Sequence, residues 1–194
     1  MNDNQGTALR ILSRETLSEN WFKLEKVTFD QTGKDGSRQT LDREVYHNGP
    51  GAVVLPIDRV RGTVLLIRQC RIPVYVNGDG PLLLEACAGM IEPDDSPTET
   101  VCKEAQQEMG YRLRNVRKVL ELYMSPGASA EKLHFFVAEY GPDDRVGTGG
   151  GLASEGERID VLELPLTRAW EMVTTGQVID AKTVLLLQHA RMEA

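Results

Sequence analysis

Residues 85–111 of the 194-residue chain read EACAGMIEPDDSPTETVCKEAQQEMGY, and this pattern predicts a strand end, a glycine turn, an acidic loop and one short helix. Ser96, Pro97 and Glu99 fit a capping box with proline at the first helical position, which satisfies free N–H groups at a helix start. Gly110 marks the helix end, because glycine readily adopts the left-handed conformation found there.

The predicted helix has two distinct faces. Val101, Ala105 and Met109 recur every four residues and form an apolar stripe for packing on a core. Glu104 and Glu108 also stand one helical turn apart, so their like charges repel and require a compensating cation. A pair of carboxylates beside the carbonyls of a glycine turn suits Mg²⁺. The alternative interpretation is an acidic helix face that is simply solvated.

The surrounding residues favour the metal interpretation, because residues 89–111 resemble the Nudix box. The family pattern is Gly, five residues, Glu, seven residues, then Arg-Glu-apolar-x-Glu-Glu-x-Gly-apolar. This chain departs from it with Asp95 in place of Glu, Lys103 in place of Arg, and Gln107 in place of the first Glu of the pair. Gln107 accepts hydrogen bonds but has no negative charge, so we expect weaker binding of one metal ion.

Composition restricts the possible partners. A net charge of -7 argues against a nucleic-acid backbone or an anionic membrane as the main partner. A phosphate-bearing substrate would then need local cations in its site. The polar start MNDNQG does not resemble a signal peptide, and no apolar run approaches ~20 residues. Cys70, Cys87 and Cys102 lack metal-type spacing and are interpreted as reduced core or near-core thiols, which indicates a cytoplasmic protein.

The chain is expected to divide into a disordered tail (1–8), an N-terminal antiparallel β-layer (9–48) and a Nudix hydrolase domain (49–194). In the β-layer, the sequence GKDG at 33–36 predicts a hairpin, and a phase shift between Leu24 and Val27 suggests a bulge. Flat strand edges of this kind often pair with another subunit.

Outside the box, the pattern predicts an α/β/α sandwich around a mixed sheet, which is the fold that the Nudix resemblance also implies. Strands are expected at 52–58, 63–70, 82–89, 132–140 and 159–165, with a strand pair around 115–126. Helices are expected at 166–175 and 180–189. Residues 71–78 are expected to form a loop ending in a turn, and 141–157, with three consecutive glycines, a mobile loop.

The resemblance extends from about residue 9 to 188, and it is to the GDP-mannose pyrophosphatase branch of the ADP-ribose pyrophosphatase-like Nudix enzymes. The matching segments include NWFKLEKVTFDQTGKDG, DREVYHNGPGAVVLP, VLLIRQCRIPVYVNG and ELYMSPG. It implies hydrolysis of a nucleoside-diphosphate sugar, with GDP-mannose favoured, to GMP and mannose 1-phosphate. The alternatives are hydrolysis of ADP-ribose to AMP and ribose 5-phosphate, or a non-catalytic nucleotide-sugar sensor, which Gln107 alone supports.

The resemblance also implies the site residues. Glu104, Glu108 and the Ala88 carbonyl would hold Mg²⁺, with Mn²⁺ as a possible substitute, and Lys103 would orient the neighbouring carboxylates. The general base, also a metal ligand, would be Glu155 or Glu157, and counting back from Ile159 favours Glu157. Glu85 would support the metal site without binding the metal itself. The branch implies a homodimer. The expected substrate contacts are Trp21, Arg43, Glu44, Arg71, Ala88, Gly89, Glu131, Glu155 and Lys182.

Overall fold

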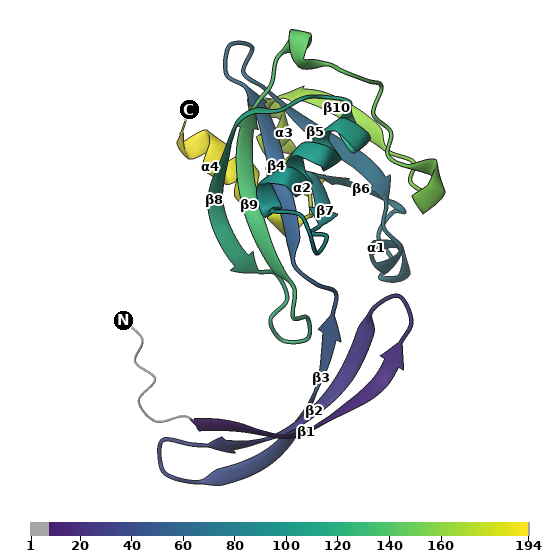
Figure 1. The fold of residues 1–194 in the computed structure, drawn as a ribbon. Coiled ribbons are helices and arrows are strands. Elements are labelled where there is room, and N and C mark those ends of the chain that lie inside the picture. The colour runs from purple at the N-terminus through teal and green to yellow at the C-terminus, as the bar shows by residue number, and fades with distance from the viewer. Residues whose placement is uncertain (1–7, 194) are drawn as a thin grey trace. The chain divides into compact units, whose positions relative to one another are not determined.

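The computed structural model describes residues 8–193, with the side chain of Glu155 left out. The described residues fall into two compact units. The N-terminal unit lies within Met1–Gly49 and Tyr123–Glu131, and the main unit lies within Pro50–Leu122 and Lys132–Ala194. Figure 1 labels the elements of both units. No helix in the described range is long and apolar enough to cross a membrane.

The N-terminal unit contains the antiparallel strands β1 (Ala8–Glu19), β2 (Lys23–Thr32) and β3 (Arg38–His47), in that order across the sheet. This confirms the predicted antiparallel β-layer. The predicted hairpin is also confirmed, because the GKDG turn joins β2 to β3 with Gly36 at a φ of 79°.

Two details of this layer were predicted wrongly. Ala8 begins β1, whereas the rest of the predicted tail lies outside the described residues. β2 pairs with β3 without a break, so there is no bulge on β2 toward β3. The register shifts instead lie in the pairing of β1 with β2, between Ile11 and Ser13 and between Thr16 and Ser18. The irregularity therefore falls on an edge strand, where an extra residue disturbs only one ladder.

The main unit is built on a mixed sheet. Its strands are β4 (Gly51–Asp58), β5 (Thr63–Cys70), β6 (Leu82–Glu85), β7 (Cys87–Met90), β8 (Arg114–Tyr123), β9 (Lys132–Glu139) and β10 (Asp160–Pro165). Within the described residues the order is β10-β5-β4-β9-β8, with β6 beside β5 and β7 beside β4. β4 runs parallel to β9 and antiparallel to β5 and β7. β4 is buried along its whole length, as expected for a central strand.

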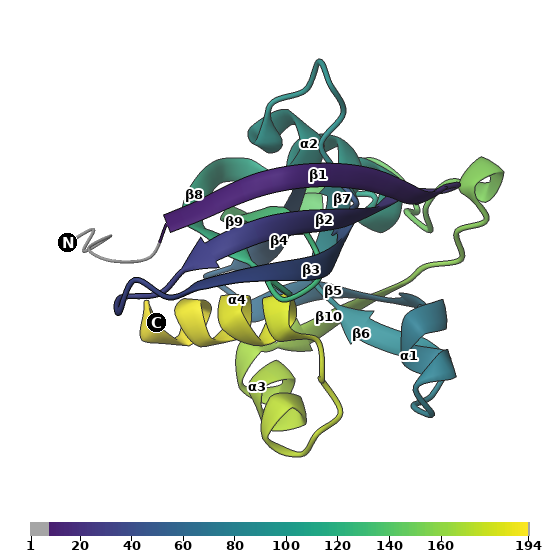
Figure 2. The same ribbon diagram turned by 90° about the horizontal axis from the view of Figure 1, so that it is seen from below.

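Helices cover both faces of this sheet. They are α1 (Ile72–Val76), α2 (Pro97–Glu104), α3 (Leu166–Thr174) and α4 (Ala181–Met192). Figure 2 shows α2 on one face of the sheet and α3 and α4 on the other. The predicted α/β/α sandwich is therefore confirmed. The predicted apolar stripe packs on the core, because Val101 of α2, and Ala105 and Met109 of the turn that follows it, have no exposed surface and lie in one core cluster with strands of the sheet.

Three local predictions outside the box at 89–111 are wrong. The expected loop at 71–78 contains the single-turn helix α1, which is too short to show a helical period. The expected strand pair around 115–126 is one strand, β8, because no turn interrupts its extended backbone before Tyr123. Cys70 is exposed rather than near the core, since it shares the outward face of β5 with Arg68.

Candidate active site

The helix predicted in the box comprises α2 and the turn Ala105–Met109 that follows it, and it is called the box helix below. It begins and ends at the predicted residues. Oγ of Ser96 accepts a hydrogen bond from the backbone N of Glu99 at 3.2 Å, and the backbone N of Ser96 donates to Oε2 of Glu99 at 2.8 Å. The capping box is therefore confirmed. Gly110 ends the helix at a φ of 77°. The last turn, Ala105–Met109, is a wide π-helical turn, a feature often found at functional sites, and it carries Glu108.

Glu108 is the central acidic group of the site. Its side chain is buried, with only 2% of the residue exposed, and its Oε2 has no hydrogen-bond partner among the described residues. Burial raises the pKa of Glu108 to about 8, and repulsion from Glu104, Glu157 and Glu85 adds to this shift. Three other carboxyl groups therefore act on Glu108, and a bound cation would relieve this repulsion.

Gly89 provides the space for a second carboxylate. A side-chain carbon at Gly89 would overlap the carboxylate of Glu104, so any larger residue there would displace it. Gly89 and Ala88 lie in β7, where they pair with Ala52 and Val53 of the buried strand β4. The expected glycine turn is therefore wrong, because these residues belong to a strand that continues past Gly89, and this strand contacts Glu104 on the acidic face of the box helix.

A buried ion cluster lies behind these carboxylates. Glu85 is fully buried and accepts a hydrogen bond from Nε of Arg71 at 2.7 Å and another from Nζ of Lys182 at 2.6 Å. Lys182 also donates to Oδ1 of Asp180 at 2.9 Å. Burial alone would lower the pKa of Lys182, but attraction to Glu85 and Asp180 outweighs it and raises that pKa. Lys182 is therefore held in its charged form by the two carboxyl groups that it contacts.

The same region contains two residues that the sequence analysis missed. Asp180 caps the N-terminus of α4 by accepting a hydrogen bond from the backbone N of Thr183 at 3.0 Å. Oγ1 of Thr183, which is fully buried, accepts from the backbone N of Ala86 at 2.7 Å. An aspartate before a helix is a recognisable capping signal. The bond to Ala86 has no sequence signal, because 97 positions separate the two residues.

Lys103 and Asp95, two positions where the chain departs from the box pattern, are paired with each other. Nζ of Lys103 lies 2.6 Å from Oδ1 and 2.7 Å from Oδ2 of Asp95. The pair is partly solvated, since 59% of the Lys103 side chain is exposed. Gln107, the third departure, is exposed on the same helix.

Glu157 lies on the loop that follows the triple glycine. Its Oε2 accepts a hydrogen bond from the backbone N of Leu152 at 2.8 Å, and its charge is felt by Glu108. The side chain of Glu155 lies outside the described residues. Glu157 therefore lies near enough to Glu108 to contribute to the raised pKa of Glu108, as Glu104 and Glu85 do.

The remaining predicted contacts lie in the N-terminal unit. Trp21 is 82% exposed and stacks edge to face on Phe22. Arg43 is exposed and donates to the backbone O of Asp42 at 2.7 Å. Glu44 lies opposite Lys26 in the pairing of β3 with β2, and the backbone N of Glu131 donates to Oγ of Ser129 at 3.0 Å.

The acidic cluster fits a divalent cation. Glu108 presents a buried carboxylate oxygen without a hydrogen-bond partner in the described structure, and Gly89 leaves room for the carboxylate of Glu104. Among the described residues, no three His, Cys, Asp or Glu side chains are grouped so that they could hold a metal ion together. This arrangement suits Mg²⁺, which is usually held by one or two carboxylates, water and substrate phosphates.

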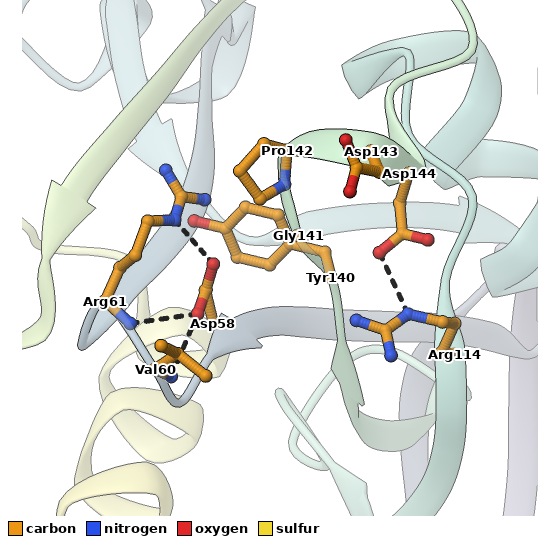
Figure 3. Close-up of a pocket in the computed structure, with 9 residues that line it drawn as sticks. All are labelled: Asp58, Val60, Arg61, Arg114, Tyr140, Gly141, Pro142, Asp143 and Asp144. Carbon is orange, nitrogen blue, oxygen red and sulfur yellow. Dashed lines mark hydrogen bonds and ion pairs between the residues drawn. The ribbon is translucent and has the colours of Figure 1, made fainter.

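A cleft of about 600 Å³ lies at the end of β4 away from these carboxylates. Figure 3 shows Asp58 and Arg61 on one side of the Tyr140 ring, and Arg114 with Asp144 on the other. Arg61 donates to Asp58 from Nε, and Arg114 donates to Asp144 at 2.9 Å. Asp58 and Asp144 are thus each paired with an arginine, unlike Oε2 of Glu108, which has no hydrogen-bond partner among the described residues.

Comparisons with known proteins agree with this geometry. The family description "NUDIX domain" matches residues 47–187, and "GDP-mannose pyrophosphatase NudK N-terminal domain" matches residues 8–46. A protein of Pectobacterium atrosepticum named GDP-mannose pyrophosphatase is 49% identical over 93% of this chain and 92% of its own length. One of the same name from Escherichia coli O157:H7 is 45% identical over 95% of both chains. The crystal structure of an ADP compounds hydrolase shares the fold, with a TM-score of 0.72 and 22% identity over 95% of this chain and 92% of its own.

Proposed function

We propose that this chain, which belongs to the Nudix family of hydrolases, hydrolyses GDP-mannose. One water molecule splits the pyrophosphate, and the products are GMP and mannose 1-phosphate. The choice of substrate is supported by relatives of that name that are 45% to 49% identical over more than nine tenths of the chain. The single observation that carries the reaction class is Glu108, a buried carboxylate with an unpartnered oxygen among other carboxylates.

We assign the divalent metal, Mg²⁺ with Mn²⁺ as a substitute, to Glu104, Glu108, Glu157 and the carbonyl of Ala88. When bound, the ion would neutralise phosphate charge and lower the pKa of a bound water. Gly89 supports this assignment by leaving space for Glu104, and Glu85 supports it by anchoring β6, the strand that precedes β7.

Glu157 is the general base in this proposal. Its Oε2 is held by the backbone N of Leu152, so the carboxylate has a fixed direction from which it can take a proton from water. Glu155 remains the alternative. Lys103 acts indirectly, because its ammonium group is paired with Asp95 at the start of the box helix.

Arg71 and Lys182 are the proposed partners of the substrate phosphates. Both are cations beside the acidic cluster, and 40% of the Arg71 side chain is exposed. A guanidinium can bind two phosphate oxygens at once. Trp21, Arg43, Glu44 and Glu131 remain proposed substrate contacts from the N-terminal unit.

We also propose that the protein is a homodimer that pairs through its N-terminal strands. Leu9, Ile11, Leu12 and Leu17 of β1 are between 43% and 66% exposed, although they are apolar. Apolar side chains on a three-stranded sheet favour association with another surface. A single species of monomer mass in sedimentation would contradict this proposal. The unpaired cysteines favour a reducing compartment, so we place the reaction in the cytoplasm.

The substrate is tested by incubating the purified protein with Mg²⁺ and equal concentrations of GDP-mannose or ADP-ribose. We expect the initial rate with GDP-mannose to be higher, with GMP and mannose 1-phosphate appearing in equal amounts on chromatography. A higher rate with ADP-ribose would keep the reaction and overturn the substrate. Guanine differs from adenine in its exocyclic amine and O6 acceptor, so the comparison reports on base recognition.

A further inference from the structure

The triple-glycine segment is attached to the end of the box helix by backbone hydrogen bonds. The backbone N of Gly150 donates to the carbonyl of Glu108 at 2.8 Å, and that of Gly151 donates to the carbonyl of Gln107 at 3.1 Å. Val146 and Gly147 both donate to the carbonyl of Gly110, at 2.8 and 3.1 Å. Carbonyls in the last turn of a helix have no partner within the helix, and this segment supplies partners for them.

Gly149 allows this close approach. A side-chain carbon at Gly149 would lie 2.5 Å from the carbonyl O of Glu108 and 2.6 Å from the carbonyl C of Met109. Both are backbone atoms of the helix, so neither can move aside without distorting it. Gly149 also has a φ of 69°, which side chains rarely tolerate.

The same segment fixes the direction of Glu157. A side-chain carbon at Gly151 would lie 2.7 Å from Cβ of Glu157, so the glycine leaves the space that this side chain occupies. The carboxylate of Glu157 accepts from Leu152 at 2.8 Å, and the backbone N of Ile159 donates to the carbonyl of Gly150 at 3.2 Å. Glu157 is thus bonded to Leu152, which directly follows Gly151, and Ile159, two residues after Glu157, is bonded to Gly150.

We propose that Gly149 and Gly151 are positioning residues that hold Glu157 in register with Glu108 and Glu104. The inference rests on the proposed function, because Glu157 has a catalytic role only there. The box helix then carries Glu104 and Glu108, and the hydrogen bonds to its last carbonyls set the position of Glu157. A shift of about 1 Å in a reacting group can cost about a hundredfold in rate.

The test compares three glycine-to-alanine variants at saturating Mg²⁺ with GDP-mannose. Gly149→Ala removes the contact with the helix, and Gly151→Ala displaces Glu157 directly. Gly156→Ala is the matched control, because Gly156 has a similar φ of 75° but nothing within 4 Å of an added carbon. We expect kcat to fall about 10- to 100-fold in both test variants, with KM within about twofold of wild type. The control should keep kcat within about threefold.

Amide hydrogen exchange in the metal-free protein provides a readout that is independent of activity. The amides of Gly150 and Gly151 should be protected in wild type and in Gly156→Ala, and should exchange at least tenfold faster in Gly149→Ala. Unchanged kcat in both test variants, or unchanged exchange in Gly149→Ala, would overturn the proposal. If Gly149→Ala does not fold, Gly151→Ala decides by its kcat. A wild type that leaves GDP-mannose intact would instead overturn the proposed function, while hydrogen exchange would still test the attachment.

Discussion

Lys182 donates a hydrogen bond from Nζ to Oε2 of Glu85 at 2.6 Å, although 97 positions separate the two residues. The pair is shielded from solvent, because the Glu85 side chain is 1% exposed and the Lys182 side chain 14%. Arg71 occupies the other oxygen of the same carboxylate at 2.7 Å. The first turn of α4 is thereby fixed to β6, the strand that leads into Ala88 and Gly89.

Glu85→Gln should lower the free energy of unfolding by about 3 kcal/mol, because it leaves two cations beside a neutral amide in a buried place. The matched control is Glu171→Gln. Its ion pair with Arg168 is solvated, with side chains 60% and 48% exposed, and should contribute less than about 1 kcal/mol. Urea denaturation of the metal-free proteins measures both. Equal losses of unfolding free energy in the two variants would mean that the buried cluster contributes no more than a solvated ion pair.

Gln107→Glu should lower the Mg²⁺ concentration that gives half the maximal rate by several-fold, because it adds a carboxylate to the box helix beside Glu108. The neighbouring variant Gln106→Glu adds the same charge at another exposed position of the same turn. It should change this concentration less than twofold. The rate of GMP release is measured over a Mg²⁺ titration. If both variants lowered this Mg²⁺ concentration equally, the added negative charge, and not its place at residue 107, would explain the effect.

The stability of the metal-free protein should depend on pH through Glu108. Its pKa rises from 4.5 to about 8, mainly because of burial, so between these values the folded state holds a proton that the unfolded state has released. Stability from this group is therefore fully present below pH 4.5 and is lost as pH rises toward 8, by about 1.4 kcal/mol per pH unit.

Glu108→Gln removes this group from the titration. The difference in the free energy of unfolding, variant minus wild type, should become more positive from pH 6 to pH 8, as measured by urea denaturation with a chelator present. A difference that stays constant with pH would mean that Glu108 is ionised in the folded protein throughout this range.

Features set by neighbours in the sequence could be predicted. The capping box at Ser96 and the left-handed Gly110 were found because each depends on a few adjacent residues. The bond between Thr183 and Ala86 could not be predicted, because only the folded sheet brings these residues together. The hydrogen bond from Gly150 to Glu108 was missed for the same reason, since three glycines in a row indicate flexibility as readily as close packing.

The residues around Glu85 show the same limit. From the sequence, Glu85 is expected to support the metal site, and Arg71 and Lys182 are expected to contact the substrate. The structure shows that both cations bind this one carboxylate. Their spacing along the chain contains no information about that shared partner.

The proposed role of the carboxylates around Glu108 is to promote hydrolysis of the pyrophosphate of GDP-mannose by water. The decisive measurement is the rate of GMP release from GDP-mannose with Mg²⁺, made for wild type and Glu108→Gln side by side. We expect steady release by wild type and a rate at least a hundredfold lower for the variant. Equal rates for the two proteins, or no release by a folded wild type that binds GDP-mannose, would contradict it.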